Sequence, residues 1–319
     1  MAVVTSPTRS AADPSAAAGP GAPPGGARRR RPSVLPYALL IPAVVVLGIM
    51  LGYPLVRLGI MSMQEYGLPQ VFGQPAPWVG LENFRTILED SYFWTVLWRT
   101  LIFCFVNVAL TMGLGVGVAL LLDALGRKMR LFVSASLIVA WAMPALTATI
   151  IWQWMFDTEY GLVNWALGRQ GESWWANQLS FFLVATIIVV WMGVPFIAFT
   201  VYAGLTQIPD EIVEAARLDG AGLRDMFRYV AFPALKPILL ILTSLSVIWD
   251  FRVFTQIYVL QRAGGITRDT NLLGVYAYRI SIGENRFDIG AAVAVVMVAI
   301  TALLTLVYLR AMMRQEDER

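Results

Sequence analysis

Residues 180–205 read SFFLVATIIVVWMGVPFIAFTVYAGL, a run of 26 positions without a charged residue. A helix needs roughly 20 apolar residues to cross the ~30 Å hydrocarbon core of a bilayer, so this run predicts a membrane-spanning helix. The whole composition agrees, because 58% of the 319 residues are apolar and 14% are charged. Water-soluble domains average about 45–50% apolar residues and about 25% charged residues. The sequence therefore predicts an all-α integral membrane protein.

Further apolar runs on both sides of this stretch are also long enough to span a bilayer. The six predicted spans lie near residues 36–62, 99–122, 131–156, 180–205, 235–258 and 288–310. The first follows arginines, as a signal peptide would, but it is longer than an h-region of about 7–15 residues and has no clear A-x-A cleavage site. We therefore expect it to remain in the protein as a membrane anchor.

Lysine and arginine are distributed unevenly between the two sides of these spans. With the N-terminus in the cytoplasm, 15 of the 24 Lys and Arg residues fall on the inner side. Short basic loops stay cytoplasmic, so the count predicts a multi-pass membrane protein with both termini in the cytoplasm. The predicted external loops lie near 63–98, 157–179 and 259–287, and the internal loops near 123–130 and 206–233.

Both ends of the chain differ in composition from the predicted transmembrane domain, residues 33–312. Residues 1–32 are rich in Ala, Pro, Gly and Ser, which cannot bury enough apolar surface to offset the entropy of ordering. We predict a disordered cytoplasmic tail there and a short cytoplasmic tail at 313–319. The arginines Arg28 to Arg31 are interpreted as a topology determinant with a weak contact to anionic lipid, and no nucleic-acid binding is expected.

The residue inventory excludes several kinds of chemistry. Histidine is absent and Cys104 is the only cysteine, which rules out His-based acid–base catalysis, His or Cys metal clusters, an internal disulfide and a CxxC redox centre. No GxxxxGK[ST] sequence occurs, so the chain does not bind ATP through a P-loop. We expect no enzymatic activity, metal or cofactor in this chain. Cys104 is interpreted as a small buried residue, and Gly113, Gly115 and Gly117 as a face for close helix packing.

The internal loop 206–233 carries helical signals of its own. Pro209 suits the first turn of a helix, and Asp210 and Glu211 complement the positive end of the helix dipole. These residues predict a helix from Pro209 to Leu218 that stops at Gly220.

A second helix is predicted in the same loop, with an end at Pro233. Its apolar residues recur at helical spacing at Leu223, Met226, Phe227 and Val230. A charged helix pair with one apolar face either rests on lipid headgroups or packs on a partner protein, and the residues alone leave both possibilities open.

Several residues of this loop also stand at a fixed spacing: Glu214-Ala215-Ala216, then Gly220, then Val230-Ala231-Phe232-Pro233. The pattern resembles the EAA signature of ABC importer membrane subunits, with Val in place of Ile and Phe in place of Leu. The variant Asp219-Gly220-Ala221 is similar to the maltose-type sugar permeases.

Two predicted external segments also resemble that family. They are Gly80-Leu81-Glu82-Asn83-Phe84, and Ile257-Tyr258-Val259-Leu260 followed by Gly264-Gly265. Gln261 stands where the family has Thr, and Ile266 where it has Pro. The resemblance extends over roughly residues 36–312.

The resemblance implies a type I ABC importer permease fold with six transmembrane helices in the lipid bilayer of a bacterial cell membrane. It implies as partners a second homologous permease, two copies of an ATPase subunit that binds ATP and Mg, and an extracytoplasmic sugar-binding protein. The loop would sit in a groove of the ATPase. The residues that the resemblance assigns to this coupling are Glu214, Ala215, Ala216, Asp219, Gly220, Leu223, Met226, Phe227 and Pro233.

Asp250 lies, by the predicted spans, well inside the fifth of them, where a charge is costly. It either pairs with an arginine and fixes packing, or it accepts hydrogen bonds from a sugar while indole rings stack on the sugar faces. The resemblance implies that the sugar contacts are Trp141, Trp191, Gly193, Ser246, Trp249 and Asp250. Mid-span tryptophans equally serve as packing residues, and both interpretations stay open.

The predicted cargo is a sugar, a di- or oligosaccharide. Glycerol phosphate or a polyamine is an alternative, because the lone acid Asp250 would also suit a cation. A standalone secondary transporter or membrane enzyme would need coupling acids in several spans or a catalytic set of residues, and it would leave the fixed spacing in the loop unexplained.

Overall fold

The computed structural model describes residues 35–317, and these form helices joined by loops, with isolated bridges at Gln64–Trp78 and Gly67–Arg286. The chain forms two compact units, Met1–Gly52 and Tyr53–Arg319. In the first unit, the described part is α1 (Leu35–Leu47) followed by the π-helical segment η1 (Gly48–Gly52). The tail predicted at residues 1–32 lies outside the described residues, as does the end of the tail predicted at 313–319.

The second unit contains the long helices and the segments that connect them. In chain order its elements are α2 (Tyr53–Met61), α3 (Leu68–Val71), α4 (Glu82–Glu89), α5 (Ser91–Ala124), α6 (Arg127–Trp141), α7 (Ala145–Met155), α8 (Leu162–Leu167), α9 (Gln178–Leu205), α10 (Asp210–Leu218), α11 (Leu223–Asp225), η2 (Met226–Ala231), α12 (Phe232–Phe251), α13 (Thr255–Arg262), α14 (Thr267–Thr270), α15 (Leu273–Tyr278), η3 (Arg279–Gly283) and α16 (Phe287–Asp317). In the described chain, five helical stretches are long and apolar enough to cross a membrane, or six if the bent pair α6–α7 is one span.

Two of the predicted spans are broken. The run predicted as one helix over 131–156 bends by 102° between α6 and α7, where Pro144 precedes α7. A proline removes one helical hydrogen bond, and its ring crowds the preceding turn, which favours a break at this position. The run predicted over 235–258 ends at Phe251 and resumes at Thr255. Asp250 lies in the last turn of α12, and it falls within Leu223–Arg262, a stretch that is long and apolar enough to be one span, as predicted.

The stop predicted at Pro233 is also wrong. The π-helical segment η2 runs directly into α12, and Pro233 occupies the first turn of that helix. Proline fits the first turn of α12 because its fixed φ is close to the helical value. The second loop helix and the fifth long helix are therefore one continuous structure from Leu223 to Phe251.

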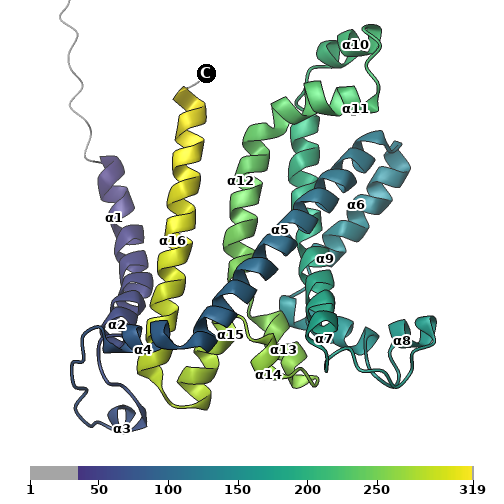
Figure 1. Cartoon of the computed structure of the whole chain (residues 1–319). Helices are drawn as coiled ribbons and strands as arrows, with labels where there is room; N and C mark the ends of the chain where they lie inside the picture. The colour runs from purple at the N-terminus through teal and green to yellow at the C-terminus, as the bar shows by residue number, and fades with distance from the viewer. Residues whose placement is uncertain (1–34, 318–319) are drawn as a thin grey trace, which may run out of the picture. The chain divides into compact units, whose positions relative to one another are not determined.

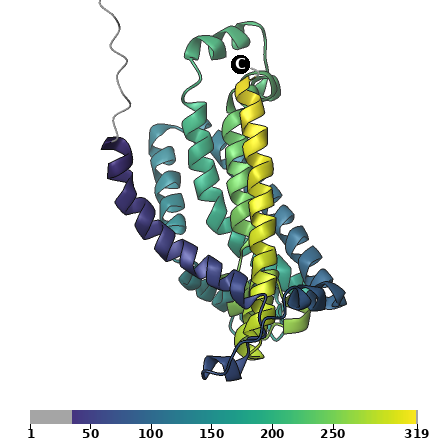
Figure 2. The same cartoon turned by 90° about the vertical axis from the view of Figure 1, so that its left-hand side faces the viewer.

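The long helices α9, α12 and α16 run side by side, and α5 crosses them obliquely (Figure 1). The quarter-turn view shows α12 next to α16 (Figure 2). α5 and α9 lie so close together that a Cβ added at Gly115 would be 2.5 Å from Ile197, and one added at Gly193 would be 2.8 Å from Thr111. Small residues permit such approach between membrane helices. Of the three glycines predicted to form a packing face, Gly115 makes such a contact, whereas a Cβ added at Gly113 or Gly117 would meet no atom within 4 Å.

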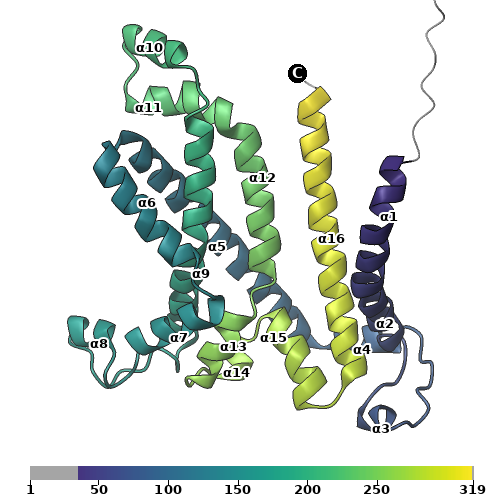
Figure 3. The ribbon, with the colours of Figure 1, turned by 180° about the vertical axis from the view of Figure 1, so that it is seen from behind.

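The two ends of the second unit carry different elements (Figure 3). We call the end with α10 and α11 the loop end, and the end with α4, α8, α13 and α14 the far end. Cys104 is buried in the core between them, as predicted, with Sγ 3.5 Å from the Val247 carbonyl oxygen.

Candidate functional site

The first helix of the loop end has the predicted boundaries. α10 begins after Pro209 and has Asp210 and Glu211 in its first turn. It ends at Leu218, and Gly220 follows with a φ of +83°. That left-handed conformation strains any residue with a Cβ, so the glycine is required by the backbone of the turn.

The predicted apolar stripe divides between two surfaces. Leu223 is 94% exposed, and Leu218 on the neighbouring helix is 89% exposed. Phe227 instead packs into the core formed by α5, α9 and α12, with its ring 6.2 Å from that of Phe232. Met226 is half-buried. Only part of the stripe is therefore available to a partner in this conformation.

The other residues assigned to coupling lie on the surface of the loop end. Glu214, Ala215, Asp219, Gly220 and Pro233 are exposed, and Ala216 is half-buried. Their contact with an ATPase subunit stays a prediction.

Three aromatic rings from three separate helices meet between the two ends. Trp141, the last residue of α6, stacks on Phe196 of α9 at 6.3 Å and an interplanar angle of 19°. Trp249 lies in the last turn of α12, and the centroid of its ring is 5.2 Å from that of the same Phe196 ring. Both indoles remain about half exposed, at 55% and 51%. We call Trp141, Phe196 and Trp249 the aromatic row.

Phe196 was missed by sequence reasoning. The sequence feature that could have pointed to it is its position directly after Pro195, in the same apolar run as Trp191, which was assigned to the sugar site. Hydropathy gives no direction for such a side chain, whereas the packing of three helices does.

The other four residues predicted to contact the sugar lie on packing faces. Gly193 faces Thr111 of α5, and Trp191 packs edge-to-face on Trp152 of α7 at 5.7 Å. Ser246 and Asp250 are 5% and 9% exposed. The buried Oδ2 atom of Asp250 has no hydrogen-bond partner within residues 35–317. The structure thus brings together Trp141 and Trp249, and their contact with a sugar stays a prediction.

Gln261, one of the two residues that depart from the family pattern in this segment, bonds to several elements of the far end. Its amide nitrogen donates to Thr270 Oγ1 and Asn271 Oδ1, both at 3.1 Å, and its Oε1 accepts from Arg279 Nη2 at 3.2 Å. Gln261 is 6% exposed, so these bonds form in a water-poor setting. One buried amide therefore ties α13, α14 and η3 together.

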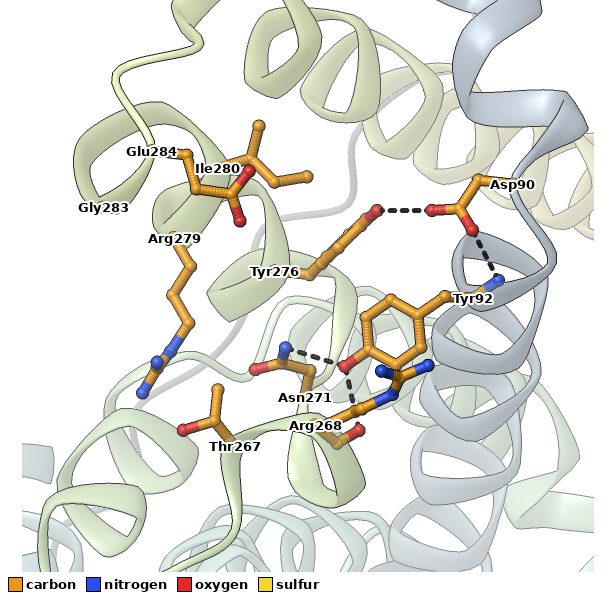
Figure 4. Close-up of a pocket in the computed structure, with 10 residues that line it drawn as sticks. All are labelled: Asp90, Tyr92, Thr267, Arg268, Asn271, Tyr276, Arg279, Ile280, Gly283 and Glu284. Carbon is orange, nitrogen blue, oxygen red and sulfur yellow. Dashed lines mark hydrogen bonds between the residues drawn. The ribbon is translucent and has the colours of Figure 1, made fainter.

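Next to this amide lies a polar pocket of about 630 Å³ (Figure 4). We call it the far-end pocket. It is lined by Asp90, Tyr92, Thr267, Arg268, Asn271, Tyr276, Arg279, Ile280, Gly283 and Glu284.

Asp90 joins two walls of the far-end pocket. Its Oδ1 accepts from the Tyr92 amide at 2.8 Å, and its Oδ2 accepts from the Tyr276 hydroxyl at 3.2 Å. Burial, reinforced by the charge of Asp90, raises the pKa of Tyr276. The hydroxyl therefore keeps its proton and remains the donor at neutral pH.

Comparison with known proteins places the chain in a family. Residues 109–316 match the family model described as "binding-protein-dependent transport system inner membrane component". The chain is 42% identical over 304 residues to the diacetylchitobiose uptake system permease protein DasB of Streptomyces coelicolor, covering 92% of each chain. It is 32% identical to the trehalose/maltose transport system permease protein MalF of Thermococcus litoralis, covering 88% of this chain and 94% of that one.

The fold matches a solved transporter as well. A bacterial ABC transporter involved in import of the acidic polysaccharide alginate superposes with a TM-score of 0.76 at 19% identity, covering 88% of this chain and 95% of that one. This agrees with the expected all-α importer fold, and the family binds no cofactor of its own. The chain therefore belongs to the binding-protein-dependent transport system inner membrane components, and it is a multi-pass, non-catalytic permease subunit of an ABC importer.

Proposed function

We propose that this permease imports a di- or oligosaccharide that an extracytoplasmic binding protein delivers. The observation that carries the proposal is the aromatic row, in which Trp141 and Trp249 present half-exposed indoles on either side of Phe196. Sugar rings have C–H groups on their faces, and these pack favourably on flat aromatic rings. The names of two relatives, a diacetylchitobiose and a trehalose/maltose permease, support a cargo of this size.

The proposed complex contains this chain, a second homologous permease and two copies of an ATPase subunit. The exposed leucines of the loop end, Leu218 and Leu223, would seat in the ATPase groove, with Glu214 and Asp219 beside them. The loop would then be cytoplasmic. The end of α16 lies at the same end as α10 and α11, which supports a cytoplasmic C-terminus (Figure 1).

Uptake by the purified complex tests the cargo. The complex is reconstituted in liposomes with its binding protein, and uptake of labelled diacetylchitobiose, maltose and trehalose is compared with that of glycerol phosphate and putrescine. We expect uptake of at least one of the sugars. Uptake of glycerol phosphate or putrescine alone would contradict a sugar cargo.

The variant Trp249→Ala tests the aromatic row itself. Loss of one stacking ring should raise the KM for the sugar by roughly tenfold, because such contacts contribute about 1.5 kcal/mol. Trp154→Ala is the matched control, since Trp154 of α7 is 63% exposed and lies outside the row. Equal KM values for the two variants would show that the row does not contact the sugar.

A further inference from the structure

We propose that the far-end pocket receives an acidic side chain of the binding protein. The inference rests on the proposed function and names a contact that delivery of the sugar would need. It concerns residues that are separate from the aromatic row.

The pocket lies where a binding protein could reach it. All ten lining residues belong to the two loops predicted to be external, 63–98 and 259–287. They gather at the first turn of α5 and around α14, α15 and η3, at the end opposite the EAA loop (Figures 1 and 4).

The pocket holds two acids and two arginines, whose formal charges sum to zero without direct ion pairing among the described residues. It is lined by Asp90, Glu284, Arg268 and Arg279. None of these four takes part in an ion pair shorter than 4 Å within residues 35–317, where the pairs are Arg85–Glu89, Arg169–Glu172 and Arg286–Asp288. Unpaired charges that share one pocket are a recognition surface for a partner that supplies the missing charge.

Asp90 is the acid whose charge is already compensated. It caps α5, a helix of 34 residues, and thus faces the positive end of that helix dipole. Its two oxygens also accept the bonds from Tyr92 and Tyr276. Two arginines then stand against one free carboxylate, that of Glu284, so the remaining charge favours an acid as the occupant.

Arg279 is held in place by a hydrogen bond, and Arg268 rests on an aromatic ring. Arg279 is bonded through Nη2 to Gln261 Oε1, and its enclosed Nε has no partner in the described structure. The Arg268 side chain is exposed, and its guanidinium lies over the ring of Tyr92 at 5.5 Å. A guanidinium that is fixed before binding loses less entropy when a carboxylate arrives, which favours a paired geometry with two hydrogen bonds.

The experiment measures how the binding protein stimulates the ATPase activity of the reconstituted complex. The binding protein used is the one recovered by chemical cross-linking to this complex in its own membrane. We expect Arg279→Gln to raise the half-saturating concentration of binding protein by about tenfold, with the same plateau, and to flatten its dependence on salt. Arg85→Gln is the matched control, because Arg85 is an exposed far-end arginine that pairs with Glu89 outside the pocket.

Charge reversal provides an independent measurement, because a compensating charge on the binding protein could not restore a misfolded permease. Arg279→Glu should weaken stimulation, and one Asp→Lys or Glu→Lys variant in a panel covering the binding protein's surface should restore it. An unchanged half-saturating concentration in Arg279→Gln overturns the inference, and so does the absence of any restoring variant in the panel. In both cases the intact complex is still stimulated, so the importer function stands. If no binding protein stimulates the intact complex, the proposed function fails and this inference fails with it.

Discussion

Leu223→Ala separates contact with an ATPase from stability of the permease. Leu223 is 94% exposed, so its truncation removes almost no packing within the chain. Surface substitutions of this kind change stability by less than about 0.5 kcal/mol. The thermal midpoint of the purified permease should therefore stay within the error of the measurement.

The affinity for the ATPase should change much more. Truncation to alanine removes three carbons, and each buried carbon contributes about 0.8 kcal/mol, so full burial in a groove would add about 2.4 kcal/mol. With some exposure retained, about 2 kcal/mol is lost, which corresponds to roughly thirtyfold in the dissociation constant. The assay is titration of the isolated ATPase subunit onto permease complexes in nanodiscs.

Two control variants show whether the effect belongs to the loop end. Leu179→Ala alters a similarly exposed leucine at the far end, and it should leave ATPase binding unchanged. Phe227→Ala alters a core residue, and it should lower the thermal midpoint of the permease by a loss of about 2 kcal/mol, roughly half the cost of a fully buried ring. If the dissociation constant of the ATPase for Leu223→Ala is within threefold of its value for the unaltered protein, the assignment of the exposed leucine to the groove is refuted.

Three further predictions concern residues whose surroundings are tightly defined. Gly115→Val should destabilise the permease by about 1–3 kcal/mol in thermal unfolding, because its Cβ would lie 2.5 Å from Ile197, whereas Gly117→Ala has open space and should be neutral. Gly220→Ala should reduce uptake with membrane insertion intact, since a φ of +83° costs a Cβ-bearing residue about 1–2 kcal/mol. Uptake equal to that of the unaltered protein would show that the left-handed turn at Gly220 is not required for transport. Gln261→Leu should abolish three hydrogen bonds and expose α13 and α14 to proteolysis, and unchanged protection would show that the amide is dispensable.

The parts of the fold that follow from local chemistry could be predicted from the sequence. Apolar runs located the long helices, and Pro209 with Gly220 located both ends of α10. The break after Phe251 was not predicted, because a hydropathy pattern measures how apolar a segment is and not whether it is straight. Pro144 was the available signal for the bend between α6 and α7.

Side-chain direction was the harder part of the site. Trp249 and Asp250 are adjacent in sequence, yet one is half exposed and the other is buried, because successive residues of a helix point about 100° apart. The face that each takes depends on where α5 and α9 pack, and these contacts are far away in sequence. For the same reason Phe196 and the buried role of Gln261 became visible only in three dimensions.

The chain from Leu223 to Phe251 is helical without a break, so it links the loop end to the aromatic row. Figure 1 shows α11 lying across the end of α12, so the arm is α12 alone, whose 20 residues span roughly 30 Å at about 1.5 Å per residue. A tilt of about 10° that pivots at one tip displaces the opposite tip by about 5 Å over this length. That distance is comparable to the 5.2 Å between the rings of Phe196 and Trp249. If the ATPase pushes on the loop as proposed, a tilt of this size would change the spacing of the aromatic row without any helix having to unfold.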